Sequence, residues 1–147
     1  MSALIAAVCL VVATVAVHVS GIYILIRRLH DIGAQDFIKR GGAFVLGALL
    51  LLTLSVMALH MIEVWMWAAF YRVAVSVGDW QTAVYFSLGC YSTVGAESVV
   101  LPREWRLLEG VEAMVGALMF GMSAAFLFAV VNQIHRRWRD SADEAGA

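Results

Sequence analysis

YFSLGCYSTVGAES, residues 85–98, is the stretch that decides the fold. An apolar segment from Trp80 to Tyr91 runs into this loop of small residues, and as a helix it covers about 18 Å, too short to cross a hydrocarbon layer of about 30 Å. It must enter the membrane and return, with Asp79 as the expected N-cap. The negative C-terminal end of this half-helix favours a cation. The polar backbone that follows cannot face lipid and has to line a path for water or ions.

The composition around this loop is that of a membrane protein. Of 147 residues, 63% are hydrophobic, and the mean hydropathy is +0.86, whereas soluble domains average about 45–50% apolar residues. A formal net charge of -1 argues against nucleic-acid binding. Cys9 and Cys90 both fall in expected intramembrane segments, with no spacing for a disulfide or a metal site.

The first segment, residues 1–28, contains an uncharged apolar run over 3–26 that is long enough for a transmembrane helix. A secretory signal peptide is the alternative, but such a peptide has positive charge before its apolar core, and here Arg27 and Arg28 follow it. We favour a retained helix with its N-terminus outside. The linker at 29–41 adds Lys39 and Arg40, and this positive charge predicts a cytoplasmic loop, either solvated or lying on the membrane as a short amphipathic helix.

Two further apolar runs flank the loop. Residues 42–72 predict an outer helix with Trp65, Trp67 and Tyr71 at the outer interface, and residues 103–132 predict an inner helix, with Pro102 and Glu104 in its first turn. Residues 133–147 form a cytoplasmic tail with a second basic cluster at 135–139 and an acidic end expected to be disordered.

His60 and Glu63 lie three residues apart on one face of the outer helix, and ionisable groups at membrane depth indicate a functional site by default. The structural interpretation places both near the outer interface, with Glu63 bonded to a donor on the short helix or a neighbouring subunit. A metal site or proton relay is the alternative, but no second acidic or histidine cluster is evident to complete a metal site. We therefore expect a scaffolding role.

Tyr85-Phe86-Ser87 followed by Ser92-Thr93-Val94-Gly95 resembles the pore-helix and filter run of the potassium-channel superfamily, and the resemblance extends over residues 42–132. It implies a homotetramer with a pore helix at 80–91 and a filter loop at 92–98. It also implies an acidic residue, Glu112, followed by a hinge glycine, Gly116, on the inner helix. Gly121 is a second hinge candidate, and close packing is an equally good interpretation of both glycines.

The resemblance implies filter ligands at Ser92, Thr93, Val94, Gly95 and Ala96, with potassium or another monovalent cation at Thr93, Val94 and Gly95. The motif then departs from the family, because Ala96 replaces the filter tyrosine and Glu97 and Ser98 replace a glycine and an aspartate. A non-glycine residue costs about 1–2 kcal/mol in the left-handed region. The backbone should therefore leave the family path after Gly95, with about two inner ion sites and weakened selectivity.

Glu97 has two possible positions. Four copies around the outer mouth would concentrate cations and could bind a divalent ion. Turned behind the filter, the carboxylate would be structural and would need a donor, for which Tyr85, Ser98 and Arg103 are the nearest in sequence.

The sequence thus predicts an all-α membrane protein with three transmembrane helices plus a re-entrant pore helix and filter loop, in the plasma (inner) membrane with the C-terminus cytoplasmic. We expect a passive cation channel surrounded by lipid, with no cofactor beyond permeant potassium or sodium, no nucleic acid and no small-molecule substrate. A non-conducting regulatory subunit is the alternative. An enzyme is disfavoured because no nucleophile and base pair is present. Three gating mechanisms remain open: hinge motion, lipid tension and titration of His18 or His135. The sequence does not predict a voltage sensor.

Overall fold

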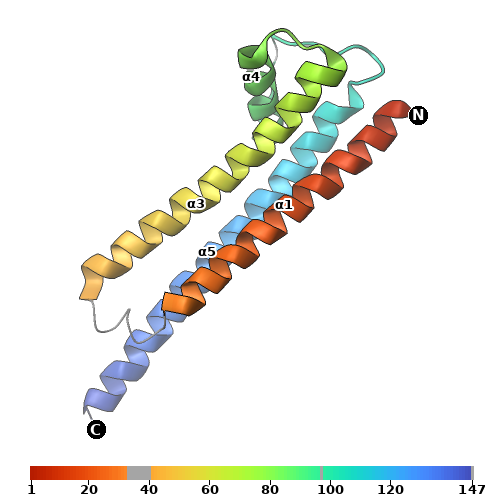
Figure 1. Ribbon diagram of the computed structural model, residues 1–147. Helices are drawn as coiled ribbons and strands as arrows, with labels where there is room; N and C mark the ends of the chain where they lie inside the picture. The colour runs from red at the N-terminus through yellow and green to blue at the C-terminus, as the bar shows by residue number, and fades with distance from the viewer. Residues whose placement is uncertain (33–40, 97, 147) are drawn as a thin grey trace.

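The computed structural model describes residues 1–32, 41–96 and 98–146, and these form helices joined by turns and loops, with no strand among them. Three long helices lie side by side, and one short helix packs at one end of them (Figure 1). The elements are α1 (Ser2–Ile32), α3 (Gly41–Phe70), a π-helical turn η1 (Tyr71–Val75), α4 (Trp80–Tyr91) and α5 (Leu107–Gly146).

The three long helices are suited to a membrane. By length and composition, Ser2–His30, Gly41–Val75 and Leu107–Arg139 can each cross a bilayer. The 12 residues of α4 are too few to do so. The chain is therefore an all-α integral membrane protein with three spanning helices and a short helix that does not span.

The N-terminus lies at the same end of the molecule as α4, and the C-terminus lies at the opposite end (Figure 1). Helix α1 packs against both α3 and α5, so it is part of the bundle. The basic residues Arg27 and Arg28 lie near the C-terminal end of α1, far from α4. The last turns of α5 lie at the same end of the molecule (Figure 1).

Helix α4 begins where the sequence predicts. The carboxylate of Asp79 accepts a hydrogen bond of 2.8 Å from the backbone N–H of Thr82, so the expected N-cap is confirmed. This bond lowers the pKa of Asp79 below its ordinary value, because it favours the ionised carboxylate.

The core lies where α4 meets the long helices. Trp67 and Tyr71 are fully buried there, so their rings pack inside the bundle, and their place at the depth of the outer interface stays a prediction. The indole N–H of Trp67 donates to the hydroxyl of Thr14 at 2.9 Å, and the ring of Tyr71 packs edge-on against Phe86 at 4.9 Å between centroids. Trp65 does remain half-exposed and lies 6.3 Å from the ring of Trp80.

Two helix bounds differ from expectation. Helix α5 begins at Leu107 rather than at 103, because Pro102 to Arg106 form tight turns with three-residue hydrogen bonds, such as Trp105 N–H to the Pro102 carbonyl at 2.8 Å. At its other end α5 continues to Gly146 instead of ending in a disordered tail. Arg, Asp, Glu and Ala residues in this stretch tolerate a helix, and no proline interrupts it.

Candidate functional site

The loop after α4 turns back on the helix that precedes it. Ser92 ends the helix, and the next residue, Thr93, has a positive φ of 63°. Its N–H donates to the Cys90 carbonyl at 2.9 Å, and the N–H of Gly95 donates to the Gly89 carbonyl at 2.9 Å. The backbone therefore reverses within four residues, and Gly95 makes this possible with a φ of 88°.

The residues predicted to form the filter are brought together in this reversal. Thr93, Val94 and Gly95 are exposed, and the side chain of Val94 is 84% exposed. Ala96 is instead buried. Glu97 lies outside the described residues, so both positions weighed for its carboxylate stay predictions.

Gly89 is required by the same reversal. A Cβ at this position would lie 2.6 Å from the Gly95 carbonyl oxygen and 3.0 Å from the Cβ of Ala96. Any side chain there would push the loop off α4, because a real Cβ does not approach another atom this closely. The glycine thus sets how tightly the loop packs on the helix.

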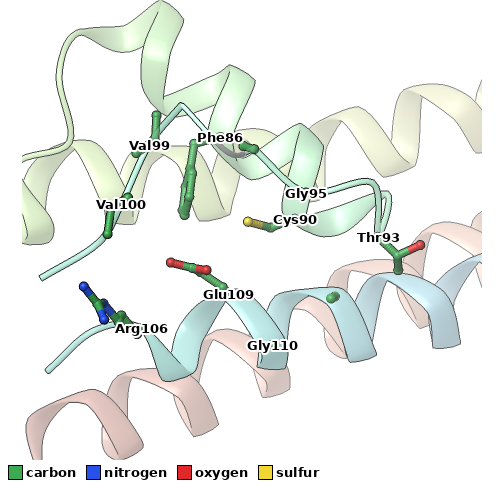
Figure 2. A pocket seen from close by; sticks show the side chains of 11 residues that line it. Phe86, Cys90, Thr93, Gly95, Val99, Val100, Arg106, Glu109 and Gly110 are labelled. Carbon is green, nitrogen blue, oxygen red and sulfur yellow. The ribbon is translucent and has the colours of Figure 1, made fainter. Parts of the chain in front are cut away.

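A cavity of about 540 Å³ opens between α4, the returning loop and the start of α5. Figure 2 shows Glu109 at the start of α5 pointing toward Phe86 and Cys90 of α4, with Arg106 beside it. Sequence reasoning assigned no role to Arg106 or Glu109. Among the described residues that line the space behind the loop, these two are charged.

Gly116 on α5 is a close-packing glycine. A Cβ there would lie 2.1 Å from the carbonyl oxygen of Tyr91, the last residue of α4. Gly121, by contrast, has no atom within 4 Å of the position its Cβ would take. The approach at Gly116 fits the close-packing interpretation, and the hinge role of Gly116 and Gly121 stays a prediction.

Two buried carboxylates hold α4 in place, and the first is Glu112. Its oxygens accept hydrogen bonds from the hydroxyl of Tyr71 at 2.7 Å and from the hydroxyl of Ser87 at 2.6 Å. The Ser87 hydroxyl also lies 2.9 Å from the carbonyl oxygen of Val64. This cluster ties the middle of α4 to the ends of the outer and inner helices.

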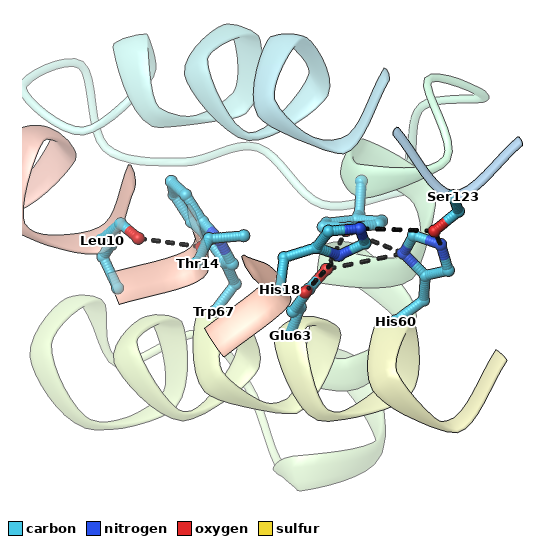
Figure 3. A network of polar contacts seen from close by, with 8 residues as sticks. Leu10, Thr14, His18, His60, Glu63, Trp67 and Ser123 are labelled. Atoms are coloured by element: carbon cyan, nitrogen blue, oxygen red, sulfur yellow. Dashed lines mark hydrogen bonds and ion pairs between the residues drawn. The ribbon is translucent and has the colours of Figure 1, made fainter. Parts of the chain in front are cut away.

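The second carboxylate is Glu63, and it lies in a ring of hydrogen bonds contributed by all four helices. His18 Nδ1 is 2.8 Å from Glu63 Oε1, and the hydroxyl of Tyr91 donates to Glu63 Oε2. His60 joins Tyr91 to Ser123, with Nδ1 3.1 Å from the Tyr91 hydroxyl and Nε2 3.0 Å from Ser123 Oγ. Ser123 Oγ closes the ring at 3.3 Å from His18 Nε2. Figure 3 shows His18 facing His60 and Glu63, with Ser123 beside His60.

Counting protons shows how this ring is satisfied. It has five links, which run in order from Glu63 to His18, from His18 to Ser123, from Ser123 to His60, from His60 to Tyr91 and from Tyr91 back to Glu63. Two neutral imidazoles and two hydroxyls supply four hydrogens, and an ionised carboxylate supplies none. One further proton, on the carboxylate or on either imidazole, would give every link a donor and make the ring electrically neutral. The cluster is therefore a self-contained polar unit in an apolar interior.

The expectation that Glu63 accepts a bond from the short helix is confirmed by Tyr91. The contribution of His18 was missed as a partner of Glu63. The two residues are 45 positions apart on separate helices, so no local spacing links them. The available signal was that each residue is an ionisable group in an otherwise apolar run.

Comparison with known proteins assigns the chain to a family. A family model described as an ion channel matches residues 45–133, which extend from α3 through α4 into α5 and leave α1 outside. Comparisons with curated proteins and with solved structures give no significant match.

Proposed function

Because the chain belongs to the two-helix, potassium-channel-like ion channel family, we propose that it is a potassium-permeable cation channel whose filter is Ser92–Gly95 in a homotetramer. One observation carries the proposal. Thr93, Val94 and Gly95 stay exposed at the end of a helix too short to cross the membrane. Exposed backbone at that depth needs partners that lipid cannot supply. Copies of the same loop around an ion supply them.

Weakened discrimination between potassium and sodium is part of the proposal. A potassium filter depends on successive rings of carbonyl oxygens, and fewer rings discriminate less well. The side chain of Ala96 is buried and packs beside Gly89. An alanine at this position supplies no aromatic ring to brace the loop from behind. The ion is then coordinated by the inner rings of carbonyl oxygens, from Thr93 to Gly95.

The orientation follows from charge. Arg27, Arg28 and the basic residues 135–139 lie toward one end of the bundle, and positive charge is retained on the cytoplasmic side. We place that end in the cytoplasm, the N-terminus and the filter loop outside, and the protein in the plasma (inner) membrane.

Flux from reconstituted vesicles tests the function. Purified protein in vesicles loaded with potassium should release it when an electrical shunt is provided, and sodium-loaded vesicles should release sodium at a rate within about tenfold of that. Gly95→Ala should abolish both fluxes, because alanine at a φ of 88° costs about 1–2 kcal/mol in each subunit. Gly47→Ala is the matched control, since α3 has open space at that Cβ.

Each result decides the proposal. Flux that survives in Gly95→Ala as fully as in Gly47→Ala would place the ion path elsewhere. A tetramer with no flux at any pH, voltage or divalent concentration would replace the channel with a non-conducting regulatory subunit.

Glu97 is tested in the same vesicles. If four carboxylates ring the outer mouth, Glu97→Gln should lower conductance and weaken block by divalent cations, because the local cation concentration falls. Unchanged conductance together with unchanged block would remove the ring and leave Glu97 a structural role.

A further inference from the structure

The ring around Glu63 contains the ligand set of a metal site. His18, His60 and Glu63 each offer a ligand atom, these atoms all lie within 4.8 Å of one another, and all three residues are buried. In a tetrahedral site with bonds of about 2.0–2.1 Å, neighbouring ligand atoms are about 3.3 Å apart. His18 Nδ1 lies 2.8 Å from Glu63 Oε1, and His60 Nδ1 lies 3.5 Å from the other oxygen, Oε2, so the two distances fall on either side of that value.

Tyr91 supplies a fourth oxygen in the same place. Its hydroxyl bonds to Glu63 and lies 3.1 Å from His60 Nδ1. Each Nδ1 atom therefore lies next to an oxygen of Glu63 or Tyr91, and the four side chains come from α1, α3 and α4. Small shifts of side chains, without a change of helix packing, would bring them to bonding distance.

Ser123 lies where a metal site needs an outer partner. Histidine ligands almost always donate their second ring N–H to a nearby acceptor, which fixes the orientation of the ring. Here Ser123 Oγ is 3.0 Å from His60 Nε2 and 3.3 Å from His18 Nε2. If both Nδ1 atoms bind a metal, both Nε2–H groups can donate to this one oxygen, which has two lone pairs.

We propose that His18, His60 and Glu63, with Tyr91 as the fourth ligand, bind a late first-row divalent ion of the zinc type. Two imidazoles and a carboxylate are the donors that this class prefers, whereas magnesium and calcium take oxygen ligands. The carboxylate of Glu63 offsets part of the positive charge in an apolar interior. The ion would join α1 to the outer helix at the level of the last residue of the pore helix.

Metal content of the purified protein tests the proposal without reference to ion conduction. The ligands are buried, so the ion should enter during folding, and the protein is best expressed in zinc-supplemented medium with a purification tag free of histidine. After removal of loose metal, elemental analysis should give about one zinc per chain. Protein expressed with cobalt should show the intense visible absorption of tetrahedral cobalt.

Three variants separate this site from surface binding. Glu63→Gln removes the anionic ligand but still gives every link of the ring a hydrogen, so it should fold and lose the metal. Ser123→Ala keeps all four ligands and should weaken binding by about 10–100-fold. His30→Ala, which removes an exposed histidine near the end of α1, should keep the full metal content.

The outcomes are distinct. Wild-type protein that carries no zinc or cobalt, yet has normal helical content and size, overturns the proposal and leaves a ring held by hydrogen bonds alone. Metal retained by Glu63→Gln, or lost from His30→Ala, also overturns it, because the ion would then be held elsewhere. Loss confined to Glu63→Gln, with weakening in Ser123→Ala, supports it. Each of these results can be interpreted even if the protein conducts no ions, because metal content is measured independently of flux.

Discussion

Glu63 and Glu112 are both fully buried, and both accept a hydrogen bond from a tyrosine, yet their surroundings differ. Glu112 is held by the hydroxyls of Tyr71 and Ser87, which lie within the part of the chain matched by the ion channel family. Glu63 adds His18, from the helix outside that match.

The difference shows how α1 is attached to the part of the chain that the ion channel family matches. The Glu112 cluster braces α4 against α3 and α5 through hydroxyl donors and includes no residue of α1. The Glu63 ring braces the end of the same helix, but it is complete only when α1 supplies an imidazole. The second brace therefore depends on α1, and the first does not.

The largest expected effect is that of Glu63→Ala, which breaks the second brace. It leaves His18 and Tyr91 without their shared acceptor in a buried place, and removing one member of a buried charged pair costs about 3–5 kcal/mol. Thermal unfolding in detergent should show a large fall in midpoint. Glu104→Ala, which removes an exposed carboxylate, is the control and should unfold like the wild type. Equal midpoints for the two variants would mean that the ring carries no stability.

A smaller effect separates the two tyrosines. Tyr91→Phe removes two links of the ring, to Glu63 and to His60, whereas Tyr71→Phe removes one bond to Glu112. Hydrogen bonds between membrane helices average about 0.6 kcal/mol each. Chemical denaturation should therefore show about 1–2 kcal/mol lost in Tyr91→Phe and about half as much in Tyr71→Phe. The reverse order would make the Glu112 cluster the stronger brace.

The smallest effect is expected at the exposed carboxylate, Asp79, which caps the same helix. Its pKa is lowered in the folded protein, so its contribution is present above the ordinary aspartate pKa of about 3.9 and is lost as the pH falls through the folded value. The wild type should unfold at a slightly higher temperature than Asp79→Ala at neutral pH, and the gap should close on acidification. A gap that does not change with pH would exclude the carboxylate as its source.

Features written locally in the chain could be predicted from the sequence. Three such features depend only on neighbouring residues, and the structure confirms each of them. They are the cap at Asp79, the span of the helix that ends at Tyr91 and the three long apolar helices. The start of the inner helix was predicted a turn too early, because Pro102 suits a first helical turn as well as it suits the tight turn that it makes.

The buried partners could not be predicted in this way. Tyr71 and Trp67 have the amphipathic rings of an interfacial belt, and only the packing of α1 and α5 against α3 shows that they are enclosed. The meeting of His18 with Glu63 depends on the relative rotation of two apolar helices, and an almost uniformly apolar sequence carries little information about which face is turned inward.

The contact of Gly116 with the carbonyl of Tyr91 has a mechanical consequence. Most helix contacts pass through side chains, which can change rotamer and so act as a soft layer between two backbones. At this point the two backbones touch directly, and nothing between them can deform. A sideways shift of the inner helix at Gly116 would be passed almost unreduced to Tyr91 and to Ser92 beside it. The joint behaves as a rigid linkage between α5 and the loop that follows α4.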